Sequence, residues 1–81
     1  MANSVRVFLS ATLRSFIEGY DAFSGLEIPI GEPITITQLC QKIGIPWERV
    51  KIAMVDGKKV AANHMVKGGE RVALFPAVGG G

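Results

Sequence analysis

The end of the sequence carries the residues with the clearest chemical potential. Gly79, Gly80 and Gly81 close the chain, shortly after Pro76. Glycine has no Cβ and ranges widely over φ and ψ, so such a tail is costly to order and adds no packing. It does offer an α-carboxylate on an arm that is narrow enough to enter the catalytic channel of another protein. This carboxylate is ionised at neutral pH.

An inert tail is the simplest alternative, because chain termini are usually loose. The residues before the glycines favour a function. Residues 72–75 are an apolar run typical of a final strand, and Pro76 lacks a backbone N–H, so the strand should end at or near Phe75 and release the tail. The sequence contains neither G-x-x-x-x-G-K-[ST] nor G-x-G-x-x-G. We therefore expect a carrier or substrate, not an enzyme, with no stably bound cofactor.

Composition narrows the class of protein. The 81 residues are enough for one domain, 48% of them are hydrophobic, and nine Lys and Arg against seven Asp and Glu give a net charge of +2. The cations form no basic stripe with interleaved aromatics, so we expect no nucleic-acid partner. No signal peptide or run of membrane-spanning length is present, which predicts a cytoplasmic protein without a membrane partner. The single Cys40 predicts neither an internal disulfide nor a cysteine metal site.

Local patterns predict one helix and a set of strands. Thr35 and Gln38 form a T-x-x-Q capping box before an apolar stripe of period 3.6, and Gly44 is a typical stop, so the helix should span residues 36–43. Cys40 lies on that stripe and is interpreted as a core residue. Asp56 and Gly57 predict a type I′ hairpin. The strands are expected over residues 5–9, 26–30, 51–55, 58–60 and 71–75.

The order of these elements admits few small folds. If the first and last strands lie side by side in the middle of one sheet, they are parallel, and the helix covers one face. This arrangement is the β-grasp: an α+β fold with a mixed sheet of four to five strands and one helix. We expect the domain to span residues 1–78, with residues 10–24 as an elongated connection and residues 79–81 as a flexible tail.

The sequence resembles the ubiquitin-like sulfur carriers of the MoaD/ThiS family, and within it the small subunit of molybdopterin synthase. The resemblance rests on residues 11–14 (A-T-L-R), 35–43, 55–57 (V-D-G) and 68–76 (G-G-E-R-V-A-L-F-P). The last segment is similar to the family's D-G-D-x-V-x-x-F-P-P-x-x-G-G ending. Three terminal glycines stand here where two are usual, so either Gly81 reacts or it is removed to leave Gly80.

The resemblance implies a role and partners. An adenylating enzyme related to the ubiquitin-activating enzymes would supply ATP and Mg²⁺, and the carboxylate of the terminal glycine would attack the α-phosphate. A sulfur donor protein would then convert the glycine to a thiocarboxylate. The large subunit of molybdopterin synthase would then accept the sulfur for molybdenum or tungsten cofactor synthesis. Three alternatives remain: a thiamine-type sulfur carrier, a protein modifier joined to lysines through the same glycine, and an interaction domain with an inert tail.

Partner enzymes must hold the domain while the tail is in their channel. An exposed apolar patch beside the tail is therefore expected on the open face of the sheet, and Phe8, Phe75 and Pro76 are the candidates. Strand alternation places Phe75 on the face opposite Leu74. The alternative is that Phe8 and Phe75 both face the helix.

Overall fold

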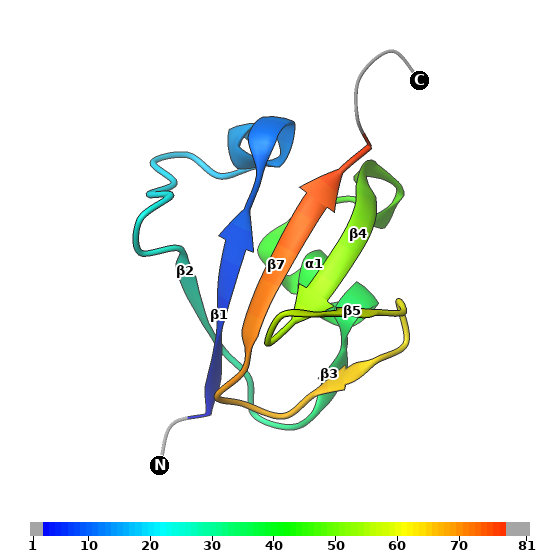
Figure 1. The fold of residues 1–81 in the computed structure, drawn as a ribbon. Helices are drawn as coiled ribbons and strands as arrows, with labels where there is room; N and C mark the ends of the chain where they lie inside the picture. Colours follow the sequence, from blue (N-terminus) through cyan, green and yellow to red (C-terminus); the bar gives the residue numbers. More distant parts are fainter. Residues whose placement is uncertain (1–2, 78–81) are drawn as a thin grey trace.

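A mixed five-stranded sheet forms the centre of the molecule (Figure 1). The computed structural model describes residues 3–77. The sheet consists of β1 (Ser4–Leu9), β2 (Leu26–Pro29), β4 (Val50–Val55), β5 (Lys58–Val60) and β7 (Arg71–Pro76), in the order β2-β1-β7-β4-β5. The neighbours β1 and β7 are parallel, with Phe8 opposite Ala73, and the other pairs are antiparallel. The predicted β-grasp arrangement is confirmed.

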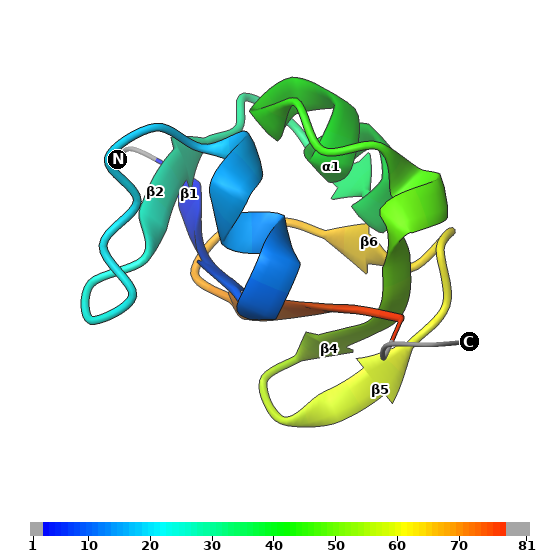
Figure 2. The ribbon, with the colours of Figure 1, turned by 90° about the horizontal axis from the view of Figure 1, so that it is seen from above.

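Helix α1 (Ile36–Ile43) covers one face of this sheet (Figure 2). Its capping box is complete: the Thr35 hydroxyl accepts from the Gln38 backbone N–H at 3.0 Å, and the Gln38 side-chain oxygen accepts from the Thr35 N–H at 2.9 Å. These bonds satisfy two donors that a helix start would otherwise leave unpaired. Gly44 ends the helix in the left-handed conformation, at φ 98°.

The hydrophobic core lies between the helix and the sheet. Strand alternation sends every second side chain of β1 and β7 inward, and the apolar stripe of α1 meets them. The fully or almost fully buried residues at this layer include Val5, Val7, Leu9, Val72 and Leu74 from the strands and Ile36, Leu39 and Cys40 from the helix. No polar side chain within residues 3–77 is buried. The open face of the sheet is left without a covering layer (Figure 2).

Two turns set the starts of β5 and β7, and the first of them is the predicted hairpin turn. Asp56 and Gly57 have φ values of 51° and 85°, so both central positions have the positive φ that a type I′ hairpin requires. Before β7, the Glu70 carboxylate accepts from the backbone N–H groups of Lys67 and Gly68, at 2.9 and 2.7 Å. The tight turn thus satisfies its own backbone donors and sets the start of β7.

The connection after β1 is more ordered than the sequence predicted. A 3-10 helix spans Ala11–Phe16 and buries Leu13 completely. Such a helix has three residues per turn, so it lacks the 3.6-residue period by which an α-helix is detected. The final strand also runs one residue beyond Phe75, because Pro76 lies opposite Val50, past an irregularity in the β4–β7 register.

A second, two-stranded sheet was not predicted. It pairs β3 (Ile34–Thr35) with β6 (Met65–Val66), which lie on opposite sides of the helix in the sequence. Each strand has two residues, too few for any alternation to be visible. A second 3-10 helix, over Trp47–Arg49, precedes β4.

Candidate functional site

The candidate site lies at the end of β7, where the described chain leads toward the glycines. β7 is paired on both sides, with β1 and with β4, and the Leu74 carbonyl accepts a further hydrogen bond from the Ser10 N–H at 3.1 Å. The chain is therefore held firmly up to Pro76. The glycines predicted to carry the chemistry, Gly79, Gly80 and Gly81, lie outside the described residues.

Phe8 and Phe75 both lie on the open face of the sheet. Their neighbours Val7, Leu9 and Leu74 are buried against the helix, so alternation turns the two rings outward, where each is half-buried. The alternative that both rings face the helix is wrong.

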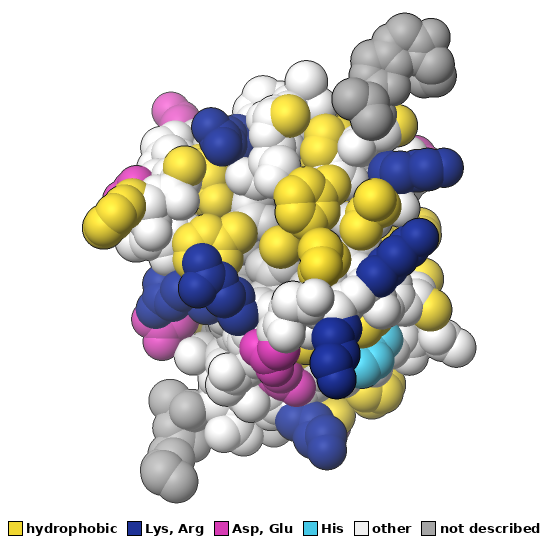
Figure 3. Space-filling view, in the orientation of Figure 1, with side chains coloured by type: hydrophobic (Ala, Val, Ile, Leu, Met, Phe, Trp, Pro, Cys, Tyr) yellow, Lys and Arg dark blue, Asp and Glu magenta, His cyan; other side chains and the backbone are white. Residues whose placement is uncertain are grey.

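Phe75 and Pro76 line an apolar groove beside the start of the tail. The groove has a volume of about 420 Å³. Its lining comes from the start of the 3-10 helix, the beginning of β4 and the end of β7. The lining residues are Ser10, Ala11, Thr12, Lys51, Ile52, Phe75, Pro76 and Ala77. Ile52 lies directly opposite Phe75 in the sheet. Hydrophobic side chains gather over β7 and β4 on this face, with Lys and Arg on both sides of them (Figure 3).

Phe8 occupies a different position from the one expected. The Arg71 guanidinium lies over its ring, 4.4 Å from the centroid. A Cβ on Gly25 would approach the same ring to 3.0 Å, so the backbone there packs against it. Phe8 does not line the groove. It belongs to the same face but is partly covered by Arg71, in a cation–π contact.

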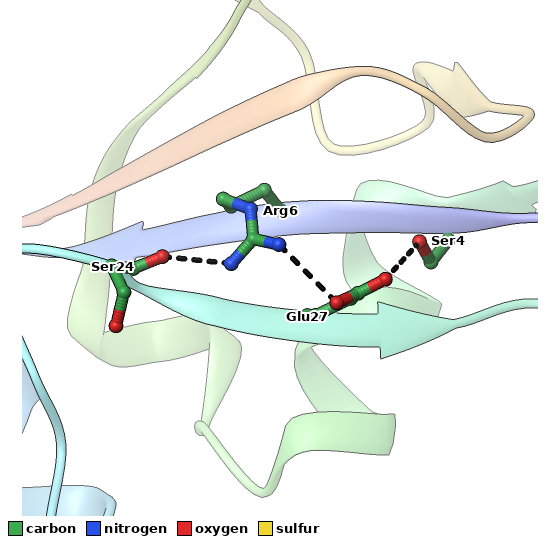
Figure 4. Close-up of polar contacts among 4 residues, drawn as sticks. All are labelled: Ser4, Arg6, Ser24 and Glu27. Atoms are coloured by element: carbon green, nitrogen blue, oxygen red, sulfur yellow. Dashed lines mark hydrogen bonds and ion pairs between the residues drawn. The ribbon is translucent and has the colours of Figure 1, made fainter.

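Cations border the apolar centre of the open face. On one side of this centre, Arg6 of β1 lies opposite Arg71 of β7. On the other side, Lys59 of β5 lies opposite Met54 of β4. Only Arg6 is in an ion pair within residues 3–77: its Nη2 donates to Glu27 at 3.2 Å (Figure 4). Both partners are exposed, so this pair adds little stability. An apolar centre with a cationic border fits a partner that carries carboxylates around an apolar contact.

The sequence indicated Phe75 and Pro76 but not Lys51, Ile52 or Ala11. Alternation predicts that either Ile52 or its neighbour in β4 points outward, yet the irregular register at this point decides which one. Ala11 reaches the groove because it begins a 3-10 helix, with φ 50°. Both features depend on the tertiary structure, so only the apolar character of Ile52 could have signalled its role.

Cys40 and His64 show no sign of a catalytic role. Cys40 is completely buried on α1, as predicted, and His64 is exposed in the connection before β6. The described part of the chain contains no group of three His, Cys, Asp or Glu side chains that could hold a metal ion. None of its helices is long and apolar enough to cross a membrane.

Burial raises the pKa of the Cys40 thiol from 9.0 to about 11. At pH 8 the folded protein should therefore react with iodoacetamide about 100-fold more slowly than the chain in urea, because only the thiolate reacts. Between pH 9 and 11 the unfolded chain loses this proton and the folded chain keeps it, so this group lowers the free energy of unfolding as pH rises. Mass spectrometry of labelled protein follows the reaction, and rapid labelling of the folded chain would contradict the assignment.

The fold defines a ubiquitin-like β-grasp protein. The chain belongs to the Mut7-C ubiquitin family, whose model matches residues 2–79. A solved structure with a similar fold is the solution structure of the Haloferax volcanii HVO 2177 protein. The two chains align over 99% of this chain and 88% of that one, with a TM-score of 0.73 and 14% sequence identity. At this identity the likeness shows the fold alone. Among curated proteins, none matches the sequence.

These comparisons confirm the predicted β-grasp fold and the ubiquitin-like family. They do not single out the MoaD/ThiS family, to which the sequence motifs pointed. The sulfur-carrier role therefore stays a prediction, as do its partners.

Proposed function

We propose that this protein is a sulfur carrier that reacts through its terminal glycine. The observation that carries the proposal is the position of β7: this central strand delivers the chain, past Pro76 and an apolar groove, to Gly79, Gly80 and Gly81. A strand paired on both sides gives the tail a fixed starting point. The groove beside it offers an enzyme a surface to grip while the tail is in its channel.

The proposed reaction has three steps. A carboxylate oxygen of the terminal glycine attacks the α-phosphate of ATP, which releases pyrophosphate and leaves an acyl-adenylate. A sulfur nucleophile from a donor protein then attacks the acyl carbon and displaces AMP, which takes the carboxylate oxygen with it. The nucleophile is the outer sulfur of a persulfide on the donor, so the product of this attack is an acyl disulfide. A thiol then cleaves its S–S bond and forms a disulfide with the donor, which leaves a thiocarboxylate on the glycine. This group is the nucleophile that transfers sulfur to a pterin precursor at the large subunit of molybdopterin synthase.

The chain contributes recognition and a reactive end, and its partners contribute catalysis. An adenylating enzyme binds ATP and Mg²⁺, because the sequence has no phosphate-binding loop of its own. In this proposal the enzyme meets the apolar groove with an apolar side chain and the border residue Lys51 with a carboxylate.

Phe75→Ala should weaken binding of the adenylating enzyme by about tenfold or more, because truncation of a central aromatic contact removes much of the binding energy. Its effect on folding should be smaller, since Phe75 is only half-buried. The measurement is the KM for the carrier in ATP–pyrophosphate exchange, alongside urea denaturation. Phe8→Ala is the matched control: this ring lies under Arg71 and outside the groove, so its KM should change less. If the folded Phe75→Ala protein has the wild-type KM, the groove is not the docking surface.

Intact mass of the protein isolated from its own cells tests the proposed reaction directly. Replacement of one oxygen by sulfur at the terminal glycine is the expected result. Adducts linked to lysines of other proteins would instead indicate a protein modifier. If the chain is unmodified in cells that are making the cofactor and is not adenylated in vitro, the remaining interpretation is an interaction domain with an inert tail.

A further inference from the structure

Phe23 is exposed to an unusual degree. Its side chain is 94% exposed, whereas the other exposed large hydrophobic residues within residues 3–77, Phe16 and Met65, reach 39% and 45%. Burial of a phenylalanine side chain stabilises a fold, and this fold forgoes that gain here. A single exposed apolar residue on a loose loop would need no explanation. The turn that carries Phe23 is not loose.

The Asp21 side chain holds this turn together. One carboxylate oxygen accepts from the Phe23 backbone N–H at 2.9 Å, and the other accepts from the Ser24 hydroxyl at 3.0 Å. The Asp21 carbonyl accepts from the Gly25 N–H at 2.8 Å. The hydrogen bond from Phe23, followed by that from Ser24, lowers the pKa of Asp21, so the carboxylate is charged at neutral pH. Asp21 thus accepts three hydrogen bonds, which fix the backbone around the exposed ring.

The same turn is anchored to the sheet. Arg6 of β1 donates from Nη1 to the Ser24 carbonyl at 2.8 Å and from Nη2 to Glu27 of β2 (Figure 4). Gly25 has a φ of +71°, and a Cβ there would lie 2.7 Å from the Val7 carbonyl oxygen. Glycine allows this close approach where a side chain would push the turn away. The position of Phe23 is therefore set by the body of the domain.

The surroundings of Phe23 differ from those of the apolar groove. The connection between the 3-10 helix and β2, residues 17–25, carries the exposed Glu18 and Asp21 and contains no lysine or arginine. The neighbouring Arg6 is paired with Glu27, so its charge is offset. The groove, by contrast, is bordered by Lys51. Figures 1 and 2 place the turn beyond the β2 edge of the sheet, on the side away from β4 and β5. The groove therefore favours an acidic partner surface, whereas the Phe23 turn favours a basic one. A protein bound at one of these surfaces can leave the other accessible.

We propose that the Phe23 turn is a second docking site, which inserts its phenylalanine into an apolar pocket with a lysine or arginine border on a partner protein. An aromatic side chain on a preorganised turn binds without the entropy cost of ordering the loop, and aromatic residues often dominate binding energies. The acidic flank makes an anionic lipid surface the less favourable target, since it would be repelled there. This inference is independent of the sulfur-carrier proposal.

The partner is identified by a photoreactive phenylalanine analogue. Benzoylphenylalanine replaces Phe23 in one full-length chain and Met65 in another, because Met65 is also exposed and lies in β6, a different element. Irradiation in the native cells should give a discrete adduct from position 23 that position 65 does not give. Mass spectrometry identifies the protein in the adduct, which is then purified for binding measurements.

Binding of the purified partner decides the proposal. Phe23→Ala should raise the Kd by about tenfold or more, while Met65→Ala should leave it within about twofold. Glu18→Gln should raise it by up to about fivefold, with a smaller effect at high salt. Because Phe23 is almost fully exposed, its replacement should leave the melting temperature unchanged. The absence of an adduct specific to position 23, equal binding by Phe23→Ala, or Phe23-dependent binding to anionic vesicles instead of to the protein would each overturn the proposal.

Discussion

A chain that lacks residues 79–81 should lose ATP–pyrophosphate exchange with its adenylating enzyme by roughly a hundredfold or more, because the reacting carboxylate no longer reaches the α-phosphate. Its free energy of unfolding should equal that of the full chain. Within residues 3–77 the sheet ends at Pro76 and the core residues run from Val5 to Leu74, so the deletion leaves this sheet and these core residues in place. Exchange assays and urea denaturation of the same preparations separate the two effects.

Shorter and longer tails locate the reacting residue. If Gly81 is the terminus that reacts, deletion of Gly81 alone should also reduce ATP–pyrophosphate exchange by roughly a hundredfold or more, because catalysis by proximity tolerates little misplacement. Retained activity would point to Gly80 and to trimming in the cell. An alanine added after Gly81 should also abolish exchange, because it moves the carboxylate and adds a side chain to an arm of glycines. If the chain without all three glycines supports exchange like the full chain, the sulfur-carrier and modifier proposals both fail.

Leu39→Ala should lower the free energy of unfolding by about 2–5 kcal/mol. Leu39 lies in the middle of α1 with no exposed surface, and truncation leaves a cavity between the helix and the sheet. Small domains have about 5–15 kcal/mol of stability in total, so this loss is a large share. Equilibrium urea denaturation followed by circular dichroism gives the value.

Met65→Ala is the control for this substitution, because Met65 is 45% exposed and its truncation opens no cavity. It should cost less than about 1 kcal/mol. A Leu39→Ala protein as stable as this control would mean that the stripe of α1 does not form the core. If the folded fraction of Leu39→Ala shows reduced exchange with the adenylating enzyme, the helix would have a role beyond stability.

The candidate site was predictable where it depended on local pattern. Alternation along β7 predicted that Leu74 and Phe75 lie on opposite faces, and in the structure Leu74 is buried and Phe75 lies on the open face. It was not predictable where it depended on contacts between distant segments. The covering of Phe8 by Arg71 requires the parallel pairing of β1 with β7, which brings together residues more than sixty positions apart. The sequence did not single out Phe23 as a docking residue for the same reason. Its exposure and the hydrogen bond from Arg6 to its turn are properties of the folded domain.

Local chemistry determined most of the individual elements of this protein. The capping box at Thr35, the stop at Gly44 and the hairpin at Asp56 and Gly57 each act over a few residues, so the sequence alone predicted them. Only the tertiary structure decided the β3–β6 pair, the 3-10 helix over Ala11–Phe16 and the groove at the end of β7. These features form because non-local packing supplies the energy that such short segments lack, and no pattern within a short window records that packing.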